Sequence, residues 1–220
     1  MIDFTYELAE REMLFSLAKD GDTFFDIGAN VGLYSISFAQ RFPKSKVYAF
    51  EPIPQMRQEL NRNLGEIRNV FIYAFGLSNT TGFVDFYFSE YDPGATSLAP
   101  LEERFGPITV VKKIVTTLDF QCHARHPAPN IIKCDVEGAE LLVLKGGVKT
   151  IEKYRPIIQC EMLRKWAKRF NYHPNDIIAF LGQFGYQCFV LRDGNLETFE
   201  TMTDETTETN FYFLPSKVRS

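Results

Sequence analysis

The sequence is poor in cysteine and has a single tryptophan and three histidines among its 220 residues. Its four cysteines lie far apart and form no C-x-x-C pair, which argues against a disulfide-rich secreted domain and against a thiol redox motif. Cys134 and Cys160 stand inside apolar runs, so we expect buried free thiols in a reducing compartment. The segment "CHARH" at 122–126 matches no zinc-ligand spacing, and we expect a surface loop there.

Long hydrophobic runs are also missing, because no apolar stretch approaches the ~20 residues that a membrane-spanning helix needs. The N-terminal "MIDFTYELAEREMLF" has no basic start followed by an apolar block, so we expect no signal peptide and a cytoplasmic location. Positive charge is not in excess either: 24 Lys and Arg face 28 Asp and Glu, giving a net charge of −4. This balance argues against a nucleic-acid partner.

What the sequence does contain is typical of a globular enzyme domain. Hydrophobic residues make up 45% of the chain, and 21 Phe and 10 Tyr predict a large aromatic core or cleft. The length fits one domain better than two, and neither a repeat nor a linker is visible, so we expect residues 1–220 to form a single domain.

Helical and strand patterns alternate along most of the chain. Apolar strand patterns are expected at 23–28, 46–51, 69–77, 130–138 and 155–162, with helical patterns in the intervening segments. Such alternation predicts an α/β fold with a doubly wound, mostly parallel sheet. The β-rich segments 82–89 and 108–120 predict a β-hairpin extension with a long loop at its tip, and 186–194 and 209–216 predict a closing antiparallel pair.

The stretch "TFFDIGANVGLYS" at 23–35 leads from an apolar strand through a glycine-rich turn into a helix. Its pattern is D-x-G-x-N-x-G, formed by Asp26, Gly28, Asn30 and Gly32. Such a turn exposes backbone amides and lets a ligand approach the main chain closely. The third glycine of the dinucleotide fingerprint is missing, and Asp26 suits a cationic ligand better than a pyrophosphate.

An acid, Glu51, ends the second expected strand, so we expect it at the same edge of the sheet as the glycine turn. Glu51 can accept both hydroxyls of a ribose there. At the end of the third strand, Leu77 and Ser78 are candidates for contact with an adenine, although an ordinary turn explains them almost equally well. The purely structural alternatives are a turn-capping role for Asp26 and a solvated acid before a proline for Glu51.

A second motif, "IIKCDVEGAELLVLKGG" at 131–147, places acids at another strand end. If this strand flanks the first on the side opposite the second, Asp135 faces the crevice where doubly wound sheets bind ligands, and Glu137 follows on the turn. Glu140 fits a charge at a helix start as well as a functional role. Glu161, at the end of "IIQCE", is expected nearby, unless it only pairs with Arg164 or Lys165.

With "FGLSN", "PGATSL" and "PIIQCEM", these two motifs resemble the FkbM-type S-adenosylmethionine-dependent methyltransferases over roughly residues 20–190. The resemblance implies a class I methyltransferase fold with a seven-stranded, mostly parallel sheet. It also implies S-adenosylmethionine as the cofactor and a saccharide or other small-molecule acceptor methylated on a hydroxyl. Residues carried over as cofactor-binding are Asp26, Gly28, Asn30, Gly32 and Glu51, and Asp135 and Glu137 belong to the acidic motif.

Methyl transfer to a hydroxyl requires alignment and removal of a proton. Asp135, Glu137 and Glu161 are the expected catalytic residues: their clustering would raise a carboxyl pKa enough for a general base. Alternatively, they could hold a divalent cation such as Mg²⁺, and the sequence does not decide between these roles. The loop at 91–100 could close over the site through Thr96 and Ser97. An NAD-type oxidoreductase and a non-catalytic S-adenosylmethionine-binding domain are the alternative functions.

Overall fold

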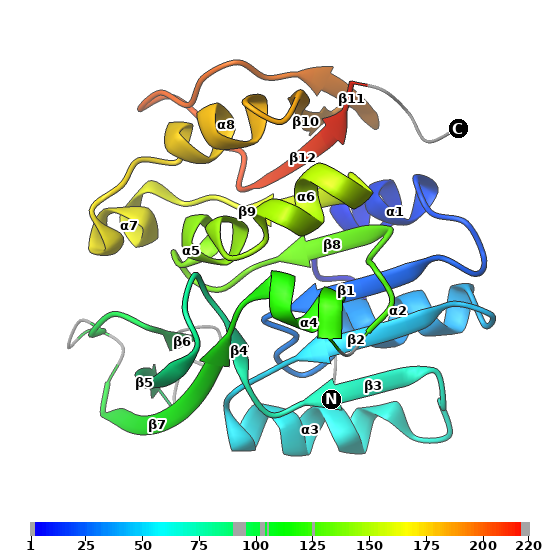
Figure 1. Cartoon of the computed structure of the whole chain (residues 1–220), viewed down its shortest axis with the longest axis vertical. Coiled ribbons are helices and arrows are strands. Elements are labelled where there is room, and N and C mark those ends of the chain that lie inside the picture. The colour runs from blue at the N-terminus through cyan, green and yellow to red at the C-terminus, as the bar shows by residue number, and fades with distance from the viewer. Residues whose placement is uncertain (1–2, 90–95, 102–103, 105, 125, 217–220) are drawn as a thin grey trace.

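The computed structural model describes residues 3–89, 96–101, 104, 106–124 and 126–216, and Figure 1 shows the arrangement of their elements. The helices and strands, in chain order, are α1 (Leu8–Ser16), β1 (Thr23–Ile27), α2 (Leu33–Arg41), β2 (Lys46–Phe50), α3 (Pro54–Leu64), β3 (Val70–Tyr73), β4 (Gly76–Leu77), β5 (Gly82–Ser89), β6 (Thr96–Ser97), β7 (Ile108–Thr116), α4 (Leu118–Ala124), β8 (Ile131–Cys134), α5 (Glu140–Lys145), α6 (Val148–Tyr154), β9 (Ile157–Glu161), α7 (Arg164–Ala167), the 3-10 turn η2 (Lys168–Phe170), α8 (Asn175–Gly182), β10 (Tyr186–Arg192), β11 (Asn195–Thr198) and β12 (Asn210–Pro215).

The main sheet has the strand order β11-β10-β12-β9-β8-β1-β2-β3. The five strands from β9 to β3 run parallel, and β12, β10 and β11 complete the sheet in antiparallel pairings. The predicted mostly parallel, doubly wound sheet is therefore confirmed. Within the described residues it has eight strands rather than seven, because the chain turns tightly after Arg192 and adds β11 beside β10.

Helices cover both faces of this sheet, and alternate strand residues pack against one or the other layer. Phe24 faces the cluster formed with α1 and α2, whereas its neighbour Phe25 faces the cluster that contains residues of α4, α5, α6 and α8. Both side chains are fully buried. A strand that is buried on both faces explains why the sequence at 23–27 reads as a continuous apolar run rather than an alternating one.

A smaller sheet, β4-β7-β5-β6, forms the predicted extension beside the main sheet (Figure 1). Its long β5–β7 pair is antiparallel from Gly82 opposite Val115 to Ser89 opposite Ile108. The expected third strand at 69–77 is divided, because the chain leaves the main sheet after Tyr73 and β4 pairs with β7 instead. Thus the extension begins at the edge of the main sheet where the predicted site lies.

Two local expectations are wrong. The expected β-rich segment 108–120 ends as a strand at Thr116, and helix α4 begins at Leu118. This helix extends into the "CHARH" segment, which is therefore not wholly a loop. The helix is fixed by Asp119, whose carboxylate accepts hydrogen bonds from the backbone amides of Lys149 and Thr150. That contact joins residues far apart in the sequence, so no local pattern indicates it.

The four cysteines are free and buried, as expected. Cys134 and Cys160 lie opposite each other on the neighbouring strands β8 and β9, in the middle of the main hydrophobic core. Among the described residues, no helix is both long and apolar enough to cross a membrane.

Candidate functional site

The glycine turn lies where β1 meets its two neighbours. Strand β1 pairs with β2 on one side and β8 on the other, so the carboxyl ends of three parallel strands meet there. Gly28 has a φ of +81°, and a Cβ on it would lie 1.8 Å from the backbone oxygen of Asp135. Glycine is therefore required at this position, because it alone lets the turn pass directly against the end of β8.

Gly32 is needed for the packing of α3 and not for the approach of a ligand to the main chain. It has a φ of +93°, and a Cβ there would lie 2.0 Å from the Leu60 side chain of α3. Leu60 is fully buried together with Ala29 and Ile36. The second glycine of the motif thus lets α3 pack against the turn, and it does not line the pocket described next.

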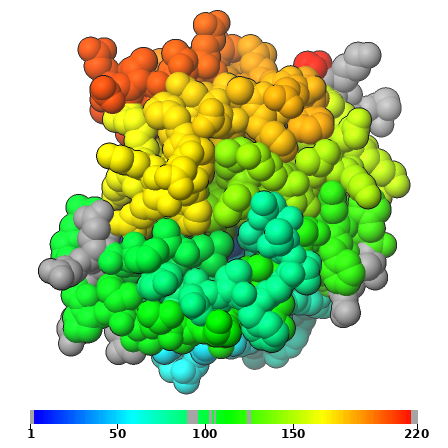
Figure 2. Space-filling model, turned by 60° about the vertical axis from the view of Figure 1, so that its left-hand side comes forward, coloured from blue at the N-terminus to red at the C-terminus, as the bar shows by residue number. Residues whose placement is uncertain are grey.

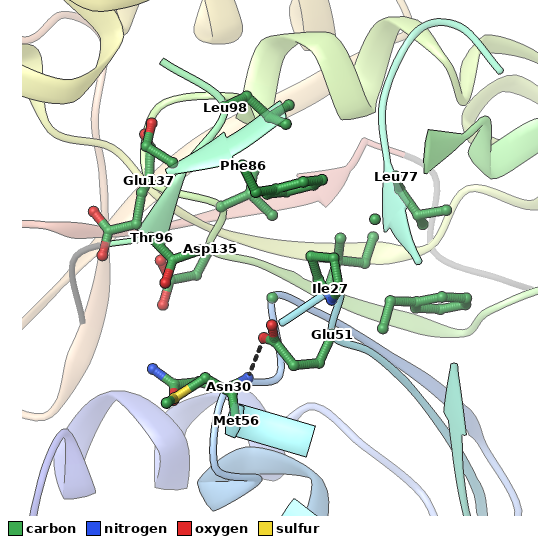
Figure 3. A pocket seen from close by; sticks show the side chains of 16 residues that line it. Ile27, Asn30, Glu51, Met56, Leu77, Phe86, Thr96, Leu98, Asp135 and Glu137 are labelled. Atoms are coloured by element: carbon green, nitrogen blue, oxygen red, sulfur yellow. Dashed lines mark hydrogen bonds between the residues drawn. The ribbon is translucent and has the colours of Figure 1, made fainter. Parts of the chain in front are cut away.

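A pocket that is partly open to solvent lies over this sheet edge and beneath the extension. Figure 2 shows the green extension below the yellow segment that carries α7, with a small recess where they meet. The pocket has an apolar end around Leu77 and a polar end at Asp135 and Glu137, as Figure 3 shows. Its full lining is Ile27, Gly28, Asn30, Phe50, Glu51, Pro52, Met56, Gly76, Leu77, Phe86, Thr96, Ser97, Leu98, Asp135, Val136 and Glu137.

Glu51 lies between the two ends and is held in place by backbone amides. One carboxylate oxygen accepts a hydrogen bond from the Asn30 amide at 2.9 Å, drawn in Figure 3, and the other accepts one from the Ile53 amide at 2.8 Å. Burial raises the pKa of Glu51 to about 7, although both amides oppose this shift. The carboxylate is thus oriented before any ligand arrives, with lone pairs left to accept hydroxyl donors.

The predicted cofactor residues divide into two groups. Gly28, Asn30, Glu51, Leu77 and Asp135 line the pocket. Asp26, Gly32 and Ser78 do not belong to this lining. Asp26 is fully buried beneath the turn, where its carboxylate accepts a 2.6 Å hydrogen bond from the Ser35 hydroxyl. Since Ser35 lies on α2, this hydrogen bond joins β1 to the helix that follows the turn.

The three acids expected to be catalytic are brought together. Asp135, Glu137 and Glu161 each offer a carboxylate oxygen within 4.8 Å of the others. Glu161 ends β9, next to the strand that leads into Asp135. Burial, reinforced by the neighbouring carboxylates, raises the pKa of Glu137 and of Glu161 well above the ordinary range of glutamate. This arrangement favours retention of protons on these two acids at neutral pH.

The loop that carries Glu137 is held in an unfavourable backbone conformation. Glu137 has a φ of +52°, a region that non-glycine residues rarely occupy. Buried Glu140 stabilises the loop, because one of its oxygens accepts hydrogen bonds from the amides of Val136 and Gly138. Ser97 of the extension donates its hydroxyl to the backbone oxygen of Glu137. Glu140 thus positions the loop from the helix start and contributes no atom to the pocket lining.

Lys133 is a site residue that the sequence reasoning missed. Its ammonium group donates a 2.9 Å hydrogen bond to Asp135 and lies 4.0 Å from Asp26. These two carboxylates raise the pKa of Lys133 well above its usual value despite complete burial. A lysine inside the apolar run "IIKC" is the signal that could have indicated it, because a buried lysine needs a charged partner.

The extension and α3 also contribute residues that were not expected. Phe86 of β5 and Met56 of α3 line the pocket, and neither was singled out by a motif. Thr96 and Ser97, expected to act from the loop at 91–100, line it as the short strand β6. Residues 91–95 of that loop lie outside the described residues, so its predicted role as a lid stays a prediction.

Comparison with known proteins agrees with this geometry. The model of the methyltransferase FkbM domain matches residues 26–188, which include the glycine turn and the acidic motif. The chain belongs to the FkbM methyltransferase family. Among curated proteins, it is 31% identical over 161 residues to 2-O-methyltransferase NoeI of Sinorhizobium fredii, covering 66% of this chain and 65% of that one. It is 29% identical over 147 residues to hexuronic acid methyltransferase AglP of Haloferax volcanii, covering 66% of this chain and 58% of that one.

Solved structures show the same fold. The family's methyltransferase FkbM from Methylobacillus flagellatus is matched with a TM-score of 0.56 at 18% identity, over 90% of this chain and 45% of that one. The likeness to a Streptococcus mutans methyltransferase has a TM-score of 0.52 at 12% identity, over 97% and 98% of the two chains. The chain thus has the Rossmann-like class I methyltransferase fold. It spans about three fifths of the length of the curated relatives it matches.

Proposed function

We propose that this chain transfers a methyl group from S-adenosylmethionine to a hydroxyl group of a saccharide or other small molecule. The observation that supports it most is the order of groups along one pocket: apolar side chains, then the Glu51 carboxylate, then the acids at the end of β8. Those groups suit an adenine, a ribose and a cationic sulfonium with its amino-acid tail. The names of the relatives NoeI and AglP specify 2-O-methylation and hexuronic acid methylation, which supports a saccharide hydroxyl.

The residues present fit this cofactor. Leu77, Met56 and Phe86 would hold the adenine, and Glu51 would accept the ribose hydroxyls. Gly28 lines the pocket, and its missing side chain makes room for the Asp135 backbone beside it. When bound, S-adenosylmethionine supplies a methyl group on positively charged sulfur, which an oxygen nucleophile can displace. An NAD-type ligand fits less well, because its pyrophosphate would lie toward Asp135 and Glu137.

The acids provide a place for the proton that the acceptor hydroxyl must lose. Glu137 is the best candidate for the general base, because its Oε2 atom is buried and has no hydrogen-bond partner among the described residues. Its raised pKa matches a base better than an ordinary carboxylate would. Asp135, by contrast, is already engaged in an ion pair with Lys133. A divalent cation held by the same three acids is the alternative, and chelation distinguishes the two.

Titration calorimetry with S-adenosylmethionine and with NAD tests the cofactor assignment. We expect a heat of binding for the first and none for the second. Formation of S-adenosylhomocysteine from a panel of glycosides and phenols then tests catalysis. Binding without turnover on any acceptor would favour a non-catalytic binding domain, and binding of NAD alone would contradict the proposal. A cytoplasmic location, in keeping with the four free thiols, is part of the same proposal.

Cofactor affinity should depend on pH through Glu51. The ionised carboxylate is the form that accepts both ribose hydroxyls, and its pKa in the free protein is raised to about 7 by burial. Affinity should therefore be full above that value and should weaken about tenfold for each pH unit below it. Calorimetry across this range measures the effect. In Glu51→Gln the affinity should be low and nearly independent of pH, and an unchanged pH profile in that variant would contradict this role.

A further inference from the structure

A second cavity opens beside the cofactor pocket and shares Asn30, Asp135 and Glu137 with it. The remaining lining includes Tyr6, Glu7, Tyr34, Lys133 and Glu161. Two of the three acids expected to be catalytic, Asp135 and Glu137, therefore lie at the junction of the two spaces, and Glu161 lines the second cavity only. If the proposed function holds, the reacting hydroxyl belongs at this junction, and the second cavity holds the rest of the acceptor.

The part of the cavity wall that Tyr6 and Glu7 contribute is fixed in place. The buried Arg11 side chain donates hydrogen bonds to the backbone oxygens of Phe4 at 2.7 Å and Tyr6 at 2.9 Å. Glu7 has a φ of +46°, and its carboxylate accepts hydrogen bonds from Tyr34 and Asn210, each at 3.0 Å. Because these hydrogen bonds join the segment to α1, α2 and β12, the segment forms a fixed part of the cavity wall.

Tyr6 is placed to present its ring to a ligand. Its side chain lines the cavity, yet the residue is 60% exposed. Burial, together with the carboxylates of Glu7, Glu161 and Asp135, raises the pKa of its hydroxyl to about 12. Tyr6 thus lines the same cavity as the acids while much of the residue remains open. An exposed aromatic ring next to hydrogen-bond acceptors suits a sugar, which has apolar C–H faces and polar hydroxyl edges.

The charge of the cavity restricts the ligand further. Its lining has the carboxyl groups of Glu7, Asp135, Glu137 and Glu161, of which Glu137 and Glu161 favour the protonated form at neutral pH. Among the described lining residues the only cationic side chain is Lys133, and it is already bound to Asp135 and near Asp26. A carboxylate on the acceptor would thus be desolvated among acids without a cation to pair with, which is costly. Sugar hydroxyls, by contrast, both donate and accept hydrogen bonds, so they can pair with ionised and with protonated carboxyl groups.

We infer that this cavity binds an uncharged saccharide ring, packed against Tyr6 and hydrogen-bonded through its hydroxyls to the acids, and that it discriminates against carboxylated sugars. The inference rests on the proposed function and narrows its acceptor class. It separates this chain from the relative named for hexuronic acid, at 29% identity.

Paired acceptors test the discrimination. S-adenosylhomocysteine formation is measured with neutral methyl glycosides and with the matching uronates, for the gluco, galacto and manno series. We expect turnover of at least one neutral glycoside, with kcat/KM at least ~10-fold above that of its uronate. Preference for the uronate, or turnover only on acceptors that are not saccharides, would overturn the inference and leave the proposed function intact. Cofactor binding with no turnover on any of these sugars also counts against it. Absence of cofactor binding would instead refute the proposed function.

The variant Tyr6→Ala tests whether the Tyr6 ring contributes to binding of the acceptor. We expect KM for the preferred glycoside to rise about 10-fold, with the Kd for S-adenosylhomocysteine unchanged within about twofold. Tyr6→Phe should keep most of the affinity, because the ring is retained. Phe4→Ala is the matched control, since Phe4 is an aromatic residue of the same segment that is 47% exposed and lies outside the cavity lining. An unchanged KM in Tyr6→Ala, or an equal rise in Phe4→Ala, would refute the role of Tyr6.

Discussion

Glu137→Gln should lower kcat by about 10²- to 10⁴-fold, the range typical of the loss of a general base. The glutamine keeps the size of the side chain at the junction of the two cavities but cannot accept the proton of an acceptor hydroxyl. In the wild-type protein the rate should rise with pH from about 7 to about 9, because the raised pKa keeps Glu137 protonated at lower pH. In the variant this rise should be lost. Steady-state kinetics across the pH range measures both effects.

Two controls make this result specific. The Kd for S-adenosylmethionine should change by less than about threefold in Glu137→Gln, so that a loss of rate is not a loss of binding. Glu152→Gln, an exposed glutamate on α6, should leave kcat unchanged. If wild-type activity instead disappears in EDTA and returns with Mg²⁺, the acids hold a cation and the assignment of Glu137 as a base is wrong. Full activity of Glu137→Gln would exclude both roles for this residue.

The strand ends of the site could be predicted because they depend on local pattern and on one topological rule. Apolar runs located β1, β2, β8 and β9, and the doubly wound order brought Glu51, Asp135 and Glu161 to one edge. The same rule could not say which motif residues face the ligand. Asp26 lies on the buried strand itself and points into the protein, whereas Asp135 comes one residue after its strand and lines the pocket.

Two of the residues that sequence reasoning missed depend on contacts between distant segments. Tyr6 lines the second cavity because Arg11 and Glu7 fix the segment before α1. Phe86 lines the pocket because the extension folds over the sheet edge, which no periodicity reveals. Lys133, in contrast, could have been noticed in the sequence, because a charged lysine stands there within an apolar run that predicts a buried strand. Such local conflicts are expected at functional sites, and this one could have been recognised.

Gly28→Ala should both destabilise the fold and abolish cofactor binding. The added Cβ would lie 1.8 Å from the Asp135 backbone oxygen, and the φ of +81° is itself unfavourable for alanine. Backbone strain of about 1–3 kcal/mol and overpacking of about 1–3 kcal/mol together predict a loss of roughly 2–6 kcal/mol in the free energy of unfolding. The turn and the end of β8 must separate to make room, which displaces Asn30 and Asp135 from the pocket. Urea unfolding and calorimetry with S-adenosylmethionine measure the two effects.

Gly194→Ala separates backbone strain from the steric effect. Gly194 lies in the turn between β10 and β11 with a φ of +79°, almost the same as Gly28, but a Cβ there would meet no atom within 4 Å. This variant should therefore lose only the strain of about 1–3 kcal/mol and should bind S-adenosylmethionine normally. The difference between the two variants measures the cost of forcing β1 and β8 apart. If both lose the same stability and Gly28→Ala still binds the cofactor, the close approach of the turn to Asp135 does not shape the pocket.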